Sequence, residues 1–203
     1  MKQIYLVRHA ESISNAGERT KNHDKIPLSK KGKLQAKELV DTLKIIPNLI
    51  VVSSYIRTYD TALPFIKKYK DTPVEIWDTH EFTYLNPKEY NNTTSHERWE
   101  SIQRYWNKSD IHYKNSHDVE SFHSFTERIK KFLERLKERK EKNIVVFSHG
   151  RFIKGVQLYL EKIKSNNNTE LTENDLQDLM TEHKKTLGKE FPILNASINI
   201  IEI

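Results

Sequence analysis

The chain has 203 residues, enough for one well-packed domain and short for two. Its 34 basic and 28 acidic residues give a formal net charge of +6, a balance that suits anionic ligands such as phosphate esters. The absence of cysteine excludes disulfides, cysteine-ligated zinc and thiol catalysis, and no stretch approaches the roughly 20 apolar residues of a membrane span.

The first apolar run is too short for a signal peptide, so we expect a soluble cytoplasmic protein. It spans residues 4–7, and two similar runs follow at 49–52 and 143–147. All three are rich in β-branched residues and lack polar alternation, which predicts strands buried on both faces of a largely parallel sheet. The terminal segment 196–203 alternates and suits an edge strand.

Helical patterns lie between these runs. They predict a helix capped by Ser29 that ends near Leu43, and a second over about 55–69 that Pro64 should kink or divide into two segments. A third, from about 120 to 139, carries an apolar stripe typical of a helix packed on a core: Phe122, Phe125, Ile129, Phe132, Leu133 and Leu136. Further helices are expected after Gly150 and from the Thr172–Asp175 capping box to about Lys185.

Strands alternating with helices predict an α/β fold with helices on both faces of the sheet. Residues 83–119 interrupt the pattern, with one predicted helix near 95–106, and read as an insertion that covers a site. The aromatic residues of this region form either the mouth of a site or a small satellite core: Tyr84, Tyr90, Trp99, Tyr105, Trp106 and Tyr113.

Chemically active residues follow each of the three buried runs. Arg8 and His9 come directly after the first, Arg57 follows the second through two serines, and His149 follows the third. Ligands of open α/β sheets bind beyond the carboxyl ends of the strands, so these side chains should surround one crevice. Arginine matches phosphate oxygens and neutral imidazole can attack phosphorus, which favours phosphoryl chemistry.

Simpler interpretations remain open for these residues. Arg57 could pair with Asp60, one helical turn away, and an Arg-His pair at a strand end is often a surface feature. The other histidines follow no metal-ligand spacing and are expected to be structural or exposed: His23, His80, His96, His112, His117, His123 and His183.

At these residues the sequence resembles the histidine phosphatase superfamily, whose members include the cofactor-dependent phosphoglycerate mutases. Segment 6–12, LVRHAES, resembles the signature of the family, and segment 146–150, VFSHG, its second-histidine motif. Segments 26–36 and 53–62 are similar to two motifs that lie between them in the family. The likeness runs from residue 4 to about 150 and includes the terminal strand, with Ala10 and Tyr55 as departures.

The resemblance implies a single histidine phosphatase domain over residues 1–203, built as a three-layer α/β/α sandwich of the phosphoglycerate mutase-like kind. It also implies a phosphatase in which His9 attacks phosphorus and forms a phosphohistidine. Arg8, Arg57 and His149, assisted by Asn15, would hold the phosphate oxygens. Glu81 is the expected general acid and Glu11 a weaker alternative, and neither a metal nor another cofactor is implied.

Four alternatives remain open at this level. The first is a mutase that returns the phosphoryl group to a second hydroxyl, although the 203-residue chain is short for one. The second is a catalytically silent domain that binds phospholigands or proteins. A nucleic-acid binder is disfavoured because basic clusters such as 137–142 contain acidic residues. A zinc hydrolase on His9, His149 and Glu81 is disfavoured by the adjacent arginines. We expect a small phosphorylated substrate, with a phosphoprotein not excluded, and no nucleic-acid or membrane partner. The oligomeric state is left open.

Overall fold

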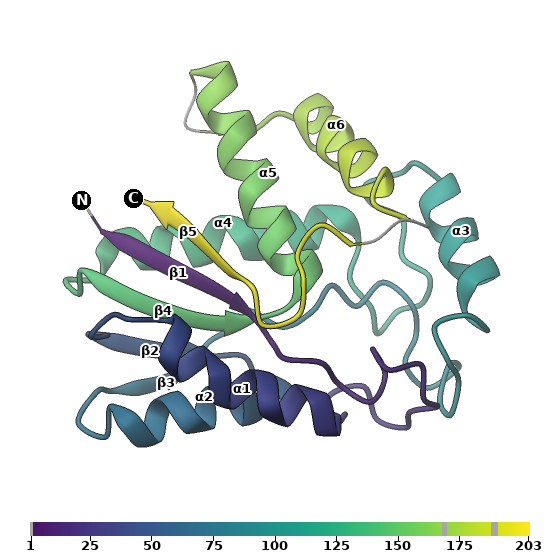
Figure 1. Cartoon of the computed structure of the whole chain (residues 1–203). Helices are drawn as coiled ribbons and strands as arrows, with labels where there is room; N and C mark the ends of the chain where they lie inside the picture. The colour runs from purple at the N-terminus through teal and green to yellow at the C-terminus, as the bar shows by residue number, and fades with distance from the viewer. Residues whose placement is uncertain (1, 168–169, 188–190) are drawn as a thin grey trace.

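A computed structural model describes residues 2–167, 170–187 and 191–203 and shows one five-stranded sheet in the order β3-β2-β4-β1-β5 (Figure 1). The first four strands are parallel, and β5 pairs antiparallel with β1 at one edge. The predicted largely parallel sheet and its edge strand are confirmed. The strands are β1 Gln3–Arg8, β2 Leu49–Val52, β3 Val74–Ile76, β4 Asn143–Ser148 and β5 Ile198–Glu202.

Strand β3 was missing from the sequence prediction. It has only three residues, and Val74 and Ile76 are both exposed because the strand lies at the sheet edge. So short a segment gives neither the continuous apolar run of a buried strand nor a measurable alternation.

Helices cover both faces of the sheet, which confirms the predicted three layers (Figure 1). Alternate residues of each central strand enter different cores because successive strand side chains point to opposite faces. Val51 joins the core under α4, α5 and α6, whereas Val52 joins the core under α1 and α2. The helices are α1 Lys30–Thr42, α2 Ile56–Lys68, α3 Trp99–Asn107, α4 Phe122–Glu138, α5 Gly150–Asn166 and α6 Glu173–Lys184.

Local sequence signals set the helix ends. The Ser29 side chain accepts from the amide of Gly32 at the start of α1, and Thr172 and Asp175 form the predicted capping box of α6. Helix α4 begins with a second capping box, and all six residues of its predicted apolar stripe are buried. The stripe is therefore a core-packing face.

One of the two outcomes predicted for Pro64, a division into two segments, does not occur in helix α2. The helix continues through this residue as one element and does not divide into two segments. Proline removes one backbone hydrogen bond from a helix interior. The flanking side chains Thr61, Ala62 and Phe65 are fully buried, and this packing holds the helix across the missing bond.

The segment 83–119 contains α3, which begins at Trp99, later than the predicted start near Ser95. Its aromatic residues lie in two environments. Tyr84, Tyr105 and Trp106 belong to the main core on the α4 side, so no separate satellite core forms. Tyr90 and Trp99 line a surface cavity together with Tyr84.

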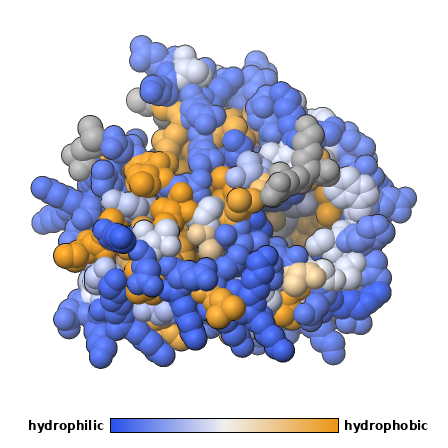
Figure 2. All heavy atoms as spheres, in the orientation of Figure 1, coloured by the Kyte–Doolittle hydropathy of each residue, from blue (hydrophilic) through white to orange (hydrophobic). Residues whose placement is uncertain are grey.

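No helix of the described residues is long and apolar enough to cross a membrane. The face seen in Figure 2 is predominantly hydrophilic, and its apolar patches are separated by polar and charged side chains. The charged fraction of 31% accounts for this appearance.

At Gly32 the first turn of α1 packs closely against the segment that follows β1. A Cβ atom at this position would lie 2.0 Å from the backbone oxygen of Glu11, far inside van der Waals contact. We expect Gly32→Ala to destabilise the protein by about 2 kcal/mol or more, although alanine favours helices by roughly 1 kcal/mol. Chemical denaturation measures the change. Lys33→Ala, at the exposed neighbouring position, is the control, and a stabilised Gly32→Ala protein would contradict the packing.

Candidate active site

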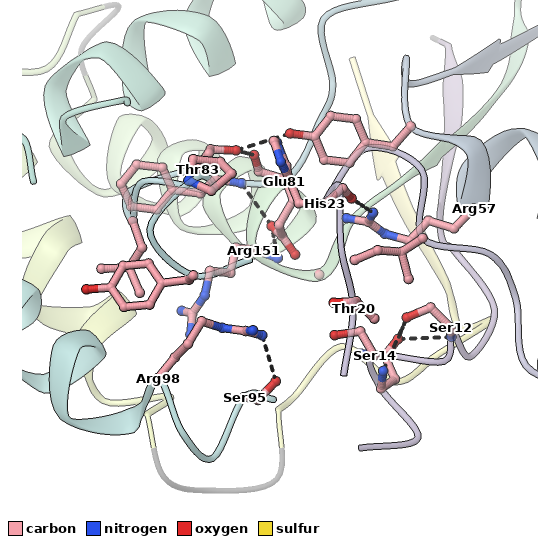
Figure 3. A pocket seen from close by; sticks show the side chains of 18 of the residues that line it. Ser12, Ser14, Thr20, His23, Arg57, Glu81, Thr83, Ser95, Arg98 and Arg151 are labelled. Atoms are coloured by element: carbon pink, nitrogen blue, oxygen red, sulfur yellow. Dashed lines mark hydrogen bonds between the residues drawn. The ribbon is translucent and has the colours of Figure 1, made fainter. Parts of the chain in front are cut away.

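A cleft of about 480 Å³ opens beyond the carboxyl ends of β1, β2 and β4. Side chains from the ends of all three strands or from the segments that follow them reach it, and part of the 83–119 segment forms another wall. Figure 3 shows how its polar side chains converge on one cavity. Arg8, His9, Asn15, Arg57 and Glu81, all singled out in the sequence, line it.

His9 lies at the end of β1 and is only 3% exposed. Its Nδ1 is 2.8 Å from the backbone oxygen of Ala10. A carbonyl oxygen can only accept, so Nδ1 carries the proton and the lone pair of a neutral ring is on Nε2. This Nε2 accepts from Nε of Arg57 at 3.2 Å. The lone pair of His9 is therefore directed at a guanidinium, and Nε2 becomes free to attack a ligand when Arg57 releases this hydrogen bond.

Burial lowers the pKa of His9 well below its ordinary value of 6.5, and the charges of Arg57 and Arg8 lower it further. The ring is therefore neutral at pH 7. A neutral imidazole keeps the lone pair that a nucleophile needs.

Arg57 projects from the first turn of α2 and is 7% exposed. It does not pair with Asp60. Its Nη1 donates to the backbone oxygen of His23 at 2.7 Å, and its Cζ lies 4.8 Å from the centre of the Tyr55 ring. Burial lowers the pKa of Arg57 to about 10, which still leaves it charged at neutral pH.

Arg8 enters the cleft from the end of β1. Its Nη1 donates to the backbone oxygen of Ile193 at 2.5 Å, whereas its buried Nε has no partner among the described residues. Asn195, which the sequence did not indicate, donates from Nδ2 to the backbone oxygen of His9 and to Oδ1 of Asn15. Because Asn15 accepts through Oδ1, its Nδ2 group can serve a ligand.

His149 is fully buried, and its ring centre lies 5.1 Å from that of His9. Its Nε2 is 2.7 Å from the Ser53 hydroxyl, while Nδ1 has no partner in the described part of the chain. Burial, followed by the charge of Arg57, holds the pKa of His149 well below 6.5. His149 is thus a neutral ring with one nitrogen anchored and one unpaired.

The two candidate acids occupy different places. Oε1 of Glu81 accepts from the backbone amides of Phe82 and Arg151, both at 3.1 Å, so its carboxylate lies in the cleft at the start of α5. Glu11 accepts from Ser29 at 2.7 Å and from Lys31 at 2.9 Å, outside the cleft lining. These bonds lower the pKa of Glu11, and only Glu81 is positioned to reach a ligand.

Several cleft residues escaped the sequence analysis. His23, grouped there with the structural or exposed histidines, lines the cleft, whereas His183 is buried in the core. Arg151 also lines the cleft, and its place just after the SHG segment at a strand end could have revealed it. Arg98 comes from the 83–119 segment, where no motif marks it. No group of three or more histidine, aspartate or glutamate side chains in residues 2–167, 170–187 and 191–203 could hold a metal ion.

Comparisons with known proteins agree with this architecture. Residues 4–176 match the family model described as the histidine phosphatase superfamily, branch 1. A search of curated proteins gives no match. Among solved structures, a phosphoserine phosphatase mutant from Entamoeba histolytica in complex with phosphoserine has a TM-score of 0.71 at 22% identity, over 98% of this chain and 90% of that one.

Two further solved structures resemble the chain. Mycobacterial glucosyl-3-phosphoglycerate phosphatase in complex with VO3 has a TM-score of 0.70 at 21% identity, over 100% of this chain and 91% of that one. An alpha-ribazole-5'-P phosphatase, described as putative, from Escherichia coli has a TM-score of 0.65 at 22% identity, over 78% of this chain and 79% of that one. At these identities the likeness establishes the fold.

Proposed function

Because the chain is an enzyme of the histidine phosphatase superfamily, branch 1, we propose that it hydrolyses phosphomonoesters through a phosphohistidine formed on Nε2 of His9. The observation that carries the proposal is the state of His9. Its Nδ1 proton is bound to the oxygen of Ala10, its ring is neutral, and its Nε2 lone pair faces the cation Arg57.

In the first step Nε2 of His9 attacks phosphorus while the bond from phosphorus to the ester oxygen breaks. The leaving oxygen takes a proton from Glu81 and departs as an alcohol. Two unpaired donors support binding of the phosphate oxygens: Nε of Arg8 and, when it carries the ring proton, Nδ1 of His149. Arg57 and Nδ2 of Asn15 complete the set. Fixed charges and donors of this kind stabilise the developing negative charge.

In the second step water attacks the phosphohistidine. Glu81, now deprotonated, accepts a proton from this water, and the bond from phosphorus to Nε2 breaks. Inorganic phosphate leaves and His9 returns to its neutral state. The cycle consumes one ester and one water and needs no other reactant.

The substrate class is supported by the size of the cleft and by the relatives. A volume of about 480 Å³ suits a small phosphorylated molecule. The solved relatives are described as phosphatases of phosphoserine, glucosyl-3-phosphoglycerate and alpha-ribazole-5'-P. We propose that the chain forms one domain and acts in the cytoplasm. We also propose that residues 83–119 cover this site, since nine of them line the cleft: Thr83, Tyr84, Leu85, Pro87, Tyr90, Ser95, Arg98, Trp99 and Ile102.

Phosphate release from p-nitrophenyl phosphate and from a panel of phosphorylated metabolites tests the proposal, with His9→Ala as the blank. Release without a bisphosphate cofactor is the expected result. Interconversion of phosphoglycerates without phosphate release would indicate a mutase. Absence of turnover on every substrate, with phosphate still bound, would indicate a silent binding domain.

Glu81→Gln should lower kcat about 100-fold for an alkyl phosphate, because the amide cannot protonate the leaving oxygen. The effect should be smaller for p-nitrophenyl phosphate, whose leaving group needs little protonation. Steady-state kinetics with both substrates measure the difference. Glu11→Gln is the control and should change neither rate by more than about tenfold. Equal losses for both leaving groups would contradict the acid role of Glu81.

A further inference from the structure

The cleft carries more positive charge than one phosphate requires. Five lysine and arginine side chains line it, whereas Glu81 is its one carboxylate among the described residues. The arginines of the proposed phosphate site, at positions 8 and 57, match the two charges of a phosphomonoester. Lys21, Arg98 and Arg151 remain, and a neutral leaving group would provide no partner for them.

Arg151 is the most informative of the three. It belongs to the first turn of α5, and its backbone amide donates to Oε1 of Glu81 at 3.1 Å. Its guanidinium carbon lies 5.5 Å from the ring centre of Trp106, 5.5 Å from that of Phe191 and 5.8 Å from that of Tyr84. Aromatic rings therefore surround a cation whose backbone touches the proposed acid.

The charge of Arg151 has no counterion in the described part of the chain. It forms no ion pair there, and its Nη1 is buried without a hydrogen-bond partner. A buried donor on a charged group that stays unpaired costs free energy. An anion bound where the Arg151 side chain lines the cleft would supply the missing counterion.

Arg98 lines the same cleft as Arg151, and the view in Figure 3 shows both side chains at this cavity. Its Nη1 donates to the backbone oxygen and hydroxyl of Thr93, and its Nη2 donates to Ser95. These bonds hold the guanidinium at the cavity. Figure 3 shows Arg98 and Arg151 on one side, Arg57 and Ser12 on the other, and Glu81 between them.

We propose that the leaving group of the substrate carries a carboxylate, which Arg151 binds with Arg98 as its neighbour. The proposal rests on the proposed function, because it takes the ester oxygen to lie at Glu81. The backbone amide of Arg151 donates to Glu81, so the two residues are neighbours in the cleft. The carboxylate of the substrate should therefore lie a few bonds from the ester oxygen. The guanidinium edge matches the oxygens of a carboxylate and of a phosphate alike. A carboxylate is favoured over a second phosphate because it is planar and smaller, and so fits between the aromatic rings around Arg151.

Matched substrate pairs test the proposal. Phosphoglycolate is compared with ethyl phosphate, and phosphoserine with phosphoethanolamine, since each pair differs by the carboxylate. The expected kcat/KM ratio of the substrate with the carboxylate to the substrate without it is about 50-fold, the value of one charge-assisted contact. In Arg151→Met this ratio should fall to within about threefold of unity, and Arg151→Lys should be intermediate. Lys154→Met, one turn further along α5 and outside the cleft lining, should keep the wild-type ratio.

Three results would overturn the proposal. The wild-type protein could hydrolyse both members of each pair at similar kcat/KM, or Arg151→Met could lower both equally and leave the ratio unchanged. Preference for ethylene glycol bisphosphate over both acids would assign the site to a second phosphate. Failure of the proposed phosphatase function can be distinguished from failure of the carboxylate site. In the first case p-nitrophenyl phosphate, which has no carboxylate, would not be hydrolysed either. Thermal unfolding shows whether each variant is folded.

Discussion

His9→Ala is expected to lower kcat for p-nitrophenyl phosphate by about 10,000-fold or more, since it removes the atom that forms the covalent intermediate. The side chain is buried and is held by hydrogen bonds to the backbone oxygen of Ala10 and from Nε of Arg57, and alanine provides no nucleophilic atom in its place. The Arg8 and Arg57 guanidiniums remain. Binding of phosphate or vanadate to the variant should therefore survive while turnover is lost.

Rapid acid quenching cannot preserve the intermediate, because phosphorus bound to histidine is labile in acid, so an alkaline quench is the appropriate measurement. With labelled substrate we expect the wild-type protein to yield a phosphorylated peptide that contains residues 3–9. His9→Ala should yield no phosphorylated peptide. His96→Ala, at an exposed position outside the cleft, is the matched control and should resemble the wild-type protein. A phosphorylated His9→Ala protein would contradict the assignment.

Arg57→Ala is expected to lower kcat/KM by about 1,000-fold, the size of effect seen when a fixed donor to a developing negative charge is lost. Arg57 also helps to lower the pKa of His9. Without that charge the pKa of His9 rises towards 6.5, so more of the ring is protonated, and inactive, at mildly acidic pH. The acid limb of the kcat/KM profile should thus move to higher pH.

The pH profile separates this role from a structural one. A loss of packing would lower the rate at every pH and leave the midpoint of the acid limb in place. Arg57→Lys keeps a charge and should hold the acid limb nearer its wild-type position, although it lacks the guanidinium fork. Arg104→Ala, on the exposed side of α3, is the control. An unchanged acid limb in Arg57→Ala would contradict the electrostatic coupling to His9.

Local and periodic features were readable from the chain itself. The buried strands appear as apolar runs because both faces of a central parallel strand are covered, and 144–147 shows this directly. The stripe of α4 and the capping box of α6 depend on neighbours three or four residues away, so spacing alone reveals them. The family motifs also allowed Arg8, His9, Arg57 and His149 to be grouped before their positions were known.

Features that depend on distant contacts were decided by the tertiary structure. Burial around Thr61 and Phe65 keeps α2 continuous through Pro64 against the local preference of proline. The edge strand β3 exists because it pairs with β2. In both cases the stabilising free energy comes from packing or pairing with residues far along the chain. A short stretch of sequence therefore gives no sign of it.

The site divides in the same way. The sequence by itself determined which side chains follow the strands, and hence the nucleophile and the phosphate arginines that we propose. The tertiary structure decided the protonation of His9, the placement of Glu81 against α5, and the presence of Arg98 and Arg151 in one cleft. Proton positions and charge pairing follow from burial and from contacts across the fold. They arise when elements separated by tens of residues come together.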